Sequence, residues 1–161
     1  MPDAGAIGSE DFELYLENIR RFTSEKLIPA ERRVEEEDAV PEELVALVER
    51  VNPTNVPGRV VVIVRMGAEK VRECLPGLIR AVVNSGLNVL WVSDPVHGNT
   101  VKTQSGYKTR SFEDIRAELR AFFDVHEAMG THVGGFHIEM TGDDVTECLG
   151  GLADITEEDL A

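Results

Sequence analysis

The sequence predicts an α/β fold in which about three parallel strands alternate with helices, preceded by N-terminal helices. Three short apolar runs, at residues 59–64, 88–93 and 135–140, have the composition of buried strands. The segments between these runs have apolar residues at helical spacing. Strands that alternate with helices imply parallel pairing through crossover connections. We divide the chain into an N-terminal helical segment, residues 1–50, and an α/β part, residues 51–161.

The N-terminal segment is predicted to be helical over residues 10–34, where apolar residues recur at helical spacing between charges. Proline lacks the N–H and crowds the preceding turn, so we expect a break near Pro29. The acidic run 35–38 is a solvated connector. Pro41 opens a second helix, because proline suits the first turn and acidic residues follow it, and this helix ends before Asn52.

The α/β part begins with a turn-rich loop, residues 52–58, and a strand over residues 59–64. A helix over residues 68–84 leads to the strand 88–93. After a polar loop, Ser111 and Asp114 have the spacing of a capping box, and the helix that they open ends at Gly130. The strand 135–140 follows, and a helical turn is expected over residues 156–160 of the acidic tail.

The composition excludes several classes of partner. The 30 acidic and 16 basic residues give a formal charge of −14, which disfavours nucleic acid and anionic membranes, because both select basic surfaces. No apolar run is long enough to span a bilayer, and the N-terminus lacks the features of a signal peptide. We therefore predict a cytoplasmic protein that binds neither nucleic acid nor membrane.

Polar residues follow the predicted strands on the side of the sheet where α/β folds build their sites. Arg65, Asp94, His97 and Glu139 all fall on that side. Imidazole and carboxylate suit Mn, Fe, Co or Zn, so His97 and Glu139 are candidate metal ligands, although each histidine has a purely structural alternative. For His126 and His132 we keep the structural interpretation.

Arg65 has two open roles. Its guanidinium offers a bidentate fork to a phosphate or carboxylate, or it pairs with a neighbouring acid such as Asp94. Lys108 and Arg110 extend the same positive pocket, or are themselves solvated or paired. The residue types alone indicate an anion site beside a possible metal.

Four motifs, in this order and spacing, resemble class II 3-deoxy-D-arabino-heptulosonate 7-phosphate (DAHP) synthase over about residues 41–161. They are Arg65-Met-Gly67, Trp91-Val-Ser-Asp-Pro-Val-His-Gly-Asn-Thr100, Gly106-Tyr-Lys-Thr-Arg110 and residues 135–151. That family is a metal-dependent (β/α)8 (TIM) barrel. It condenses phosphoenolpyruvate with erythrose 4-phosphate, the first step of the shikimate pathway to aromatic amino acids. The resemblance implies that His97 and Glu139 are metal ligands, that His97 is catalytic, and that Arg65 and Lys108 bind substrate.

The chain also departs from the family pattern. A complete barrel usually takes roughly 250 residues. The family's cysteine ligand, the aspartate of an Asp-Pro motif, a Lys-Pro-Arg segment and a Lys-x-Gly-Pro segment have no counterpart here, and Cys74 and Cys148 lie in other contexts. We therefore expect a partial barrel of about three parallel strands, an incomplete site for the divalent metal (Mn, Co, Zn or Fe), and little or no activity of this chain alone.

Two further expectations concern the partners and the origin of the chain. An open sheet exposes edges and apolar faces, so we expect a homo-oligomer, or a partner chain that completes the barrel. The alternative function is a non-catalytic phosphate-binding, regulatory or assembly module derived from the family. Residues 10–49 resemble the opening helices of an acyl-CoA dehydrogenase without its flavin-binding regions, which suggests a junction near residues 41–52.

Overall fold

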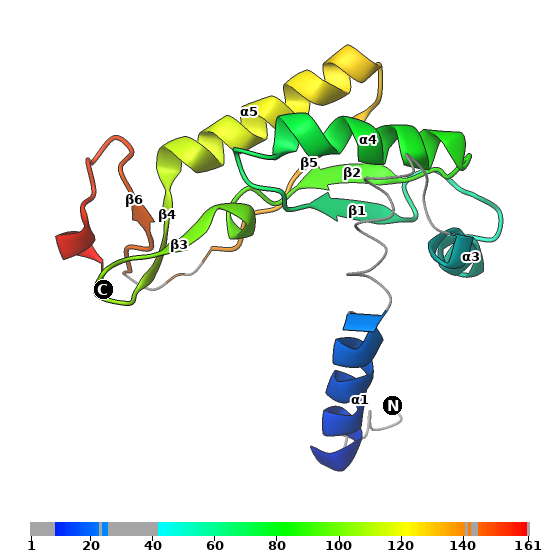
Figure 1. Ribbon diagram of the computed structural model, residues 1–161, viewed down its shortest axis with the longest axis horizontal. Coiled ribbons are helices and arrows are strands. Elements are labelled where there is room, and N and C mark those ends of the chain that lie inside the picture. The colour runs from blue at the N-terminus through cyan, green and yellow to red at the C-terminus, as the bar shows by residue number, and fades with distance from the viewer. Residues whose placement is uncertain (1–8, 23, 26–41, 141, 143–144, 161) are drawn as a thin grey trace.

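The computed structural model describes residues 9–22, 24–25, 42–140, 142 and 145–160 (Figure 1). Its α-helices are α1 (Ser9–Phe22), α3 (Glu42–Val51), α4 (Val71–Asn84) and α5 (Phe112–Met129). Its strands are β1 (Val61–Val64), β2 (Leu90–Ser93), β3 (Thr100–Lys102), β4 (Lys108–Ser111), β5 (Val133–Phe136) and β6 (Cys148–Leu149). Two short 3-10 helices, η2 (His97–Asn99) and η3 (Glu157–Asp159), complete the set. The predicted break near Pro29 and the connector 35–38 lie outside the described residues.

The main sheet has the strand order β1-β2-β5, and both of its pairings are parallel. Helices α4 and α5 lie side by side on one face of this sheet (Figure 1). Val61 pairs with Leu90 and Val64 with Ser93, so β1 and β2 end level with each other. The predicted mixed α/β fold with parallel strands is confirmed, and the polar residues that follow β1 and β2 start from the same edge.

The core lies between the main sheet and its two helices. Successive side chains of a strand point to opposite faces, so Val64 and Trp91 are buried under the helices while Val61 and Ile63 are exposed. Helix α4 buries one stripe at helical spacing, and α5 contributes the fully buried Phe122. The buried cluster comprises Val64, Val71, Leu75, Ile79, Val82, Trp91, Ala121, Phe122 and Val125.

The opposite face of the main sheet is apolar and exposed. Val61 and Ile63 of β1, which pair in register with Leu90 and Val92 of β2, are 47% and 45% exposed. Each of the two outer strands, β1 and β5, pairs with β2 alone in the described sheet. Edges and faces of this kind favour association with further strands or with another chain.

Helix α5 begins and ends at the residues that the sequence predicts. The Ser111 hydroxyl accepts a hydrogen bond from the backbone N–H of Asp114 at 3.3 Å, which satisfies one free donor of the first turn. Gly130 ends the helix with a φ of 66°, a left-handed conformation that glycine adopts without steric cost. This helix therefore has its predicted boundaries, and they fix where Glu118 meets the sheet.

Two predictions about strands are wrong. The strand predicted over residues 135–140 is β5, which begins at Val133 and ends at Phe136, level with the end of β2 at Ser93. The predicted polar loop instead contains β3 and β4, an antiparallel hairpin to which β6 adds in parallel. This second sheet depends on β6, which lies far along the chain, and its strands lack the apolar alternation that signals a strand.

Candidate active site

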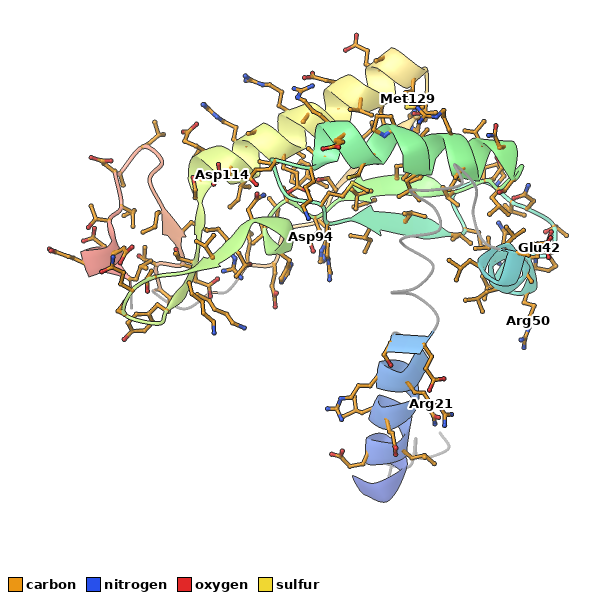
Figure 2. All side chains as sticks on the ribbon, in the orientation of Figure 1. Arg21, Glu42, Arg50, Asp94, Asp114 and Met129 are labelled. Atoms are coloured by element: carbon orange, nitrogen blue, oxygen red, sulfur yellow. The ribbon has the colours of Figure 1, made fainter. Side chains whose placement is uncertain are left out.

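Asp94 lies at the centre of a polar cluster where the strands of the main sheet end. Its side chain is 1% exposed, and its Oδ2 forms an ion pair with Nε of Arg65 at 2.6 Å. The same Oδ2 lies 2.8 Å from Nδ1 of His97, whose backbone N–H donates to Oδ1 at 3.2 Å. One buried carboxylate thus orients both the arginine that follows β1 and the histidine that follows β2. Figure 2 labels Asp94 at the end of the main sheet.

Backbone hydrogen bonds extend the pairing of the strands into this cluster. The N–H of Asp94 donates to the carbonyl of Val64 at 2.8 Å, which extends the β1–β2 pairing by one residue. The N–H of His137 donates to the carbonyl of Ser93 at 2.7 Å, which does the same for β5. The polar residues therefore start from a rigid edge of the sheet.

Asp94 is held in its ionised form. Burial by itself would raise the pKa of this carboxyl, but the hydrogen bonds from His97 and the charges of His97 and Arg65 outweigh burial and lower the pKa. The carboxylate is therefore an acceptor at neutral pH. It directs the Nδ1–H of His97 towards itself, so Nε2 is left as the atom of the ring that can bind a ligand.

His97 and Glu139 come together as the sequence predicts. Nε2 of His97 lies 3.5 Å from Oε2 of Glu139, and both side chains are accessible, at 36% and 76%. A carboxylate behind a histidine is the usual support for a metal-bound imidazole, so Asp94, His97 and Glu139 have the chemistry of two ligands with one supporting group. Within the described residues, no group of three or more His, Cys, Asp or Glu side chains could hold a metal ion, so these two side chains by themselves would supply only part of a coordination sphere.

His137 also lies in this cluster, a position that the sequence does not predict. His137 and Glu139 both follow the end of β5. Nδ1 of His137 nevertheless lies 3.8 Å from Oδ2 of Asp94. The irregular backbone after Phe136 therefore brings a second imidazole to the same carboxylate.

Lys108 and Arg110 lie in the second sheet. Lys108 is exposed and pairs in register with Lys102 across the β3–β4 hairpin. The guanidinium of Arg110 donates to Oε2 of Glu147 at 3.0 Å. Arg110 is therefore paired with an acid, which is one of the roles that the sequence left open. No contact recorded for the described part of the chain joins Lys108 to Arg65 or Asp94, so its substrate-binding role stays a prediction.

Glu118 and Asn99 are the polar residues that the sequence did not single out. Glu118 of α5 is fully buried, and its Oε1 accepts the backbone N–H groups of Met66 and Gly67 at 3.1 and 3.0 Å. Its Oε2 accepts the side-chain amide of Asn99 at 2.6 Å. Burial raises the pKa of Glu118, and these donors oppose that effect in part. Glu118 falls in an amphipathic helix where most charges face solvent, so only its contacts reveal it.

Comparisons with known proteins show the family of this chain. The model of the Class-II DAHP synthetase family matches residues 34–161, and the chain belongs to that family. It is 52% identical over 119 residues to phospho-2-dehydro-3-deoxyheptonate aldolase of Streptomyces coelicolor, covering 74% of this chain and 26% of the relative. It is 53% identical over 121 residues to phospho-2-dehydro-3-deoxyheptonate aldolase AroG of Mycolicibacterium smegmatis, covering 75% of this chain and 26% of the relative.

The chain thus spans about a quarter of the length of the curated relatives that it matches. Its resemblance to the class II synthases is confirmed, whereas the resemblance of residues 10–49 to acyl-CoA dehydrogenases stays a prediction, as do the two domain ranges. None of the described helices combines the length and the apolar character needed to cross a membrane.

Proposed function

We propose that this chain forms the late-strand part of a DAHP synthase site, which condenses phosphoenolpyruvate with erythrose 4-phosphate at the start of the shikimate pathway. The observation that carries this proposal is the contact of Asp94 with both Arg65 and His97, within motifs of the family. Alone, the chain is inactive or nearly so. Its activity requires the parts of the relatives that it does not match.

Arg65 is the phosphoenolpyruvate-binding residue in this proposal. Its side chain is 52% exposed, and Asp94 takes only the Nε atom. The terminal nitrogens of the guanidinium can then form a bidentate pair with a carboxylate or a phosphoryl group. Because Asp94 holds the fork in one orientation, less side-chain entropy is lost when the anion binds. Lys108 supplies a second cation for a phosphoryl group.

His97 and Glu139 provide two of the ligands for a divalent ion of the Mn, Co, Zn or Fe type. Such an ion, when bound, polarises the aldehyde of erythrose 4-phosphate. Asp94 accepts the Nδ1–H of His97 and so fixes the orientation of the ring, with Nε2 facing Glu139 as the atom that can act as a ligand. The missing ligands come from elsewhere in the complete assembly.

The exposed face of the main sheet indicates where that assembly continues. Val61 and Ile63 of β1 are apolar and exposed on this face, and within the described sheet each outer strand has one unpaired edge. In a (β/α)8 barrel this face is the packed interior, and neighbouring strands cover both edges. The occupant is therefore a second copy of the chain or a polypeptide that carries the earlier strands.

A reconstitution experiment tests the proposal. The purified chain is mixed with Mn²⁺ and with a fragment of the Streptomyces coelicolor relative that lacks the matching 119 residues, and product formation is measured. We expect turnover only in the mixture, and loss of turnover with Arg65→Ala but not with Arg72→Ala, since Arg72 pairs with Asp124. Turnover by the chain alone would refute its inactivity. A mixture that assembles but neither turns over nor binds phosphoenolpyruvate would refute the function.

The same measurements distinguish the alternative, a phosphate-binding or regulatory module. That function predicts heat of phosphoenolpyruvate binding to the chain alone, without metal, and loss of this heat in Arg65→Ala. It also predicts no turnover in the assembled mixture. We retain this alternative because the guanidinium of Arg65 is exposed and is held in one orientation by Asp94.

A further inference from the structure

Glu118 stands out because it is a fully buried acid whose contacts come from two loops and not from a cation. We propose that Glu118 and Asn99 are a pair of positioning residues that fixes the loop carrying Arg65 against the loop carrying His97. The pair thereby sets the distance between the anion-binding and the metal-binding side chains. This inference rests on the proposed function for the roles of Arg65 and His97, but the positioning itself can be tested without it.

The first step of the argument is that the pair contacts both loops. Glu118 receives the backbone N–H groups of Met66 and Gly67, the two residues that follow Arg65. Asn99 uses its amide oxygen to accept the N–H of Ala68 at 2.9 Å. The amide nitrogen of Asn99 donates to the carbonyl of Pro95 at 2.7 Å and to Glu118 at 2.6 Å. Four of these hydrogen bonds therefore join α5 and the two loops into one unit, and the bond to Pro95 holds Asn99 within its own loop.

The second step is that the two loops touch directly at two glycines. A Cβ atom on Gly98 would lie 2.8 Å from the backbone nitrogen of Gly67 and 3.0 Å from Oε2 of Glu118. A Cβ atom on Gly67 would lie 2.9 Å from the carbonyl oxygen of Gly98. Backbone this close leaves no room for the loops to slide past each other. Gly67 and Gly98 each lie within two residues of a site residue, so a shift at this contact moves Arg65 relative to His97.

The third step is that packing alone does not explain a carboxylate at this place. An apolar side chain would fill the helix–sheet contact without the cost of burying an acid. The carboxylate is useful here because it accepts three hydrogen bonds from donors that an apolar residue would leave unsatisfied. All three donors belong to the loops that carry the site, so the function of Glu118 lies in those loops.

The test compares Glu118→Gln with Asp124→Asn, an exposed carboxylate on the same helix. Glutamine keeps the shape and one acceptor oxygen, but it places an amide against the amide of Asn99. We expect amide hydrogen exchange at Met66 and Gly67 to accelerate about tenfold in Glu118→Gln, measured by NMR on the full chain, and to be unchanged in Asp124→Asn. In the reconstituted mixture, the affinity for phosphoenolpyruvate should fall by a similar factor.

A donor–acceptor swap supplies the rescue. In Glu118→Gln with Asn99→Asp, the new glutamine donates to the new aspartate, and the aspartate still accepts from Ala68. We expect the double variant to regain part of the lost protection and affinity, although the bond to Pro95 is lost. Lower global stability of Glu118→Gln with unchanged exchange at Met66 and Gly67 would overturn the inference. If wild type binds no phosphoenolpyruvate while exchange responds as expected, the proposed function fails and the positioning stands.

Discussion

Oδ2 of Asp94 lies 2.6 Å from Nε of Arg65 and belongs to a side chain that is only 1% exposed. The arginine follows β1 and the aspartate follows β2, so their contact ties two neighbouring strand ends together. Because the same aspartate also holds His97, a change at this one carboxylate affects both halves of the proposed site.

Replacing Asp94 by asparagine should weaken the site more than the fold. An amide carries no charge to pair with Arg65, and its nitrogen cannot accept the backbone N–H of His97 as Oδ1 of Asp94 does. We expect the affinity of the reconstituted mixture for phosphoenolpyruvate, measured by calorimetry, to fall about tenfold or more, since charge-assisted hydrogen bonds of about 1.5–3 kcal/mol are lost. Glu113→Gln removes an exposed pair with Arg116 and should leave binding unchanged. Equal affinities in wild type and Asp94→Asn would contradict the orienting role.

His126 should make stability depend on pH. Burial lowers the pKa of this fully buried ring. The ring packs at an angle against Trp91 and edge-on against Phe122, and its Nε2 has no partner among the described residues. Below a pH of about 6.5, His126 becomes protonated in the unfolded chain, whereas its buried ring stays neutral in the folded chain until lower pH. The free energy of unfolding therefore decreases as pH falls, by up to about 1.4 kcal/mol per pH unit until the folded ring titrates.

His126→Phe checks this dependence. Phenylalanine keeps the aromatic packing and loses only the contact of Nδ1 with Thr131. Urea denaturation at several pH values between about 5 and 7 should give a flatter pH profile for His126→Phe than for wild type. The exposed His132, changed to glutamine, should keep the wild-type slope. Parallel profiles for wild type and His126→Phe would show that His126 does not carry the dependence.

Gly134→Ala should destabilise the main sheet. A Cβ atom at this position would meet Cγ of Leu90 at 2.5 Å and the carbonyl oxygen of Trp91 at 2.9 Å, so β2 and β5 would have to separate. We expect a loss of about 1–3 kcal/mol in the free energy of unfolding. Gly142→Ala is the matched control, because no atom of the described residues lies within 4 Å of a Cβ atom there. Similar denaturation midpoints for the two variants would argue against the β2–β5 packing described above.

Ile63→Lys should reduce association through the open face of the main sheet. Ile63 is 45% exposed beside the free edge of β1, and a charge there opposes both face packing and edge pairing. Sedimentation velocity should show a lower average mass for this variant than for wild type. Val83→Lys, at a 57% exposed position on α4, should keep the wild-type mass. A wild-type chain that sediments as a monomer at all concentrations would remove self-association from the proposal.

The sequence by itself determined the strands β1 and β2, the two ends of α5, and the family to which the chain belongs. These features are local: β-branched runs form buried strands, Ser111 and Gly130 cap a helix, and motif residues keep a fixed spacing. Local pattern also placed Arg65, Asp94, His97 and Glu139 at one edge, and the tertiary structure brings these four side chains together. The ion pair of Arg65 with Asp94 was one of two roles that the sequence left open.

Only the tertiary structure decided which distant residues support that edge. Glu118 lies 52 positions from Met66 in sequence, and a glutamate in an amphipathic helix looks like any solvent-facing charge until its partners are seen. The hairpin of β3 and β4 likewise gains a neighbour from β6, whose Cys148 pairs with Arg110. Long-range contacts of this kind depend on how helices and strands pack, because hydrogen bonds to loop backbone leave no periodic pattern in the sequence.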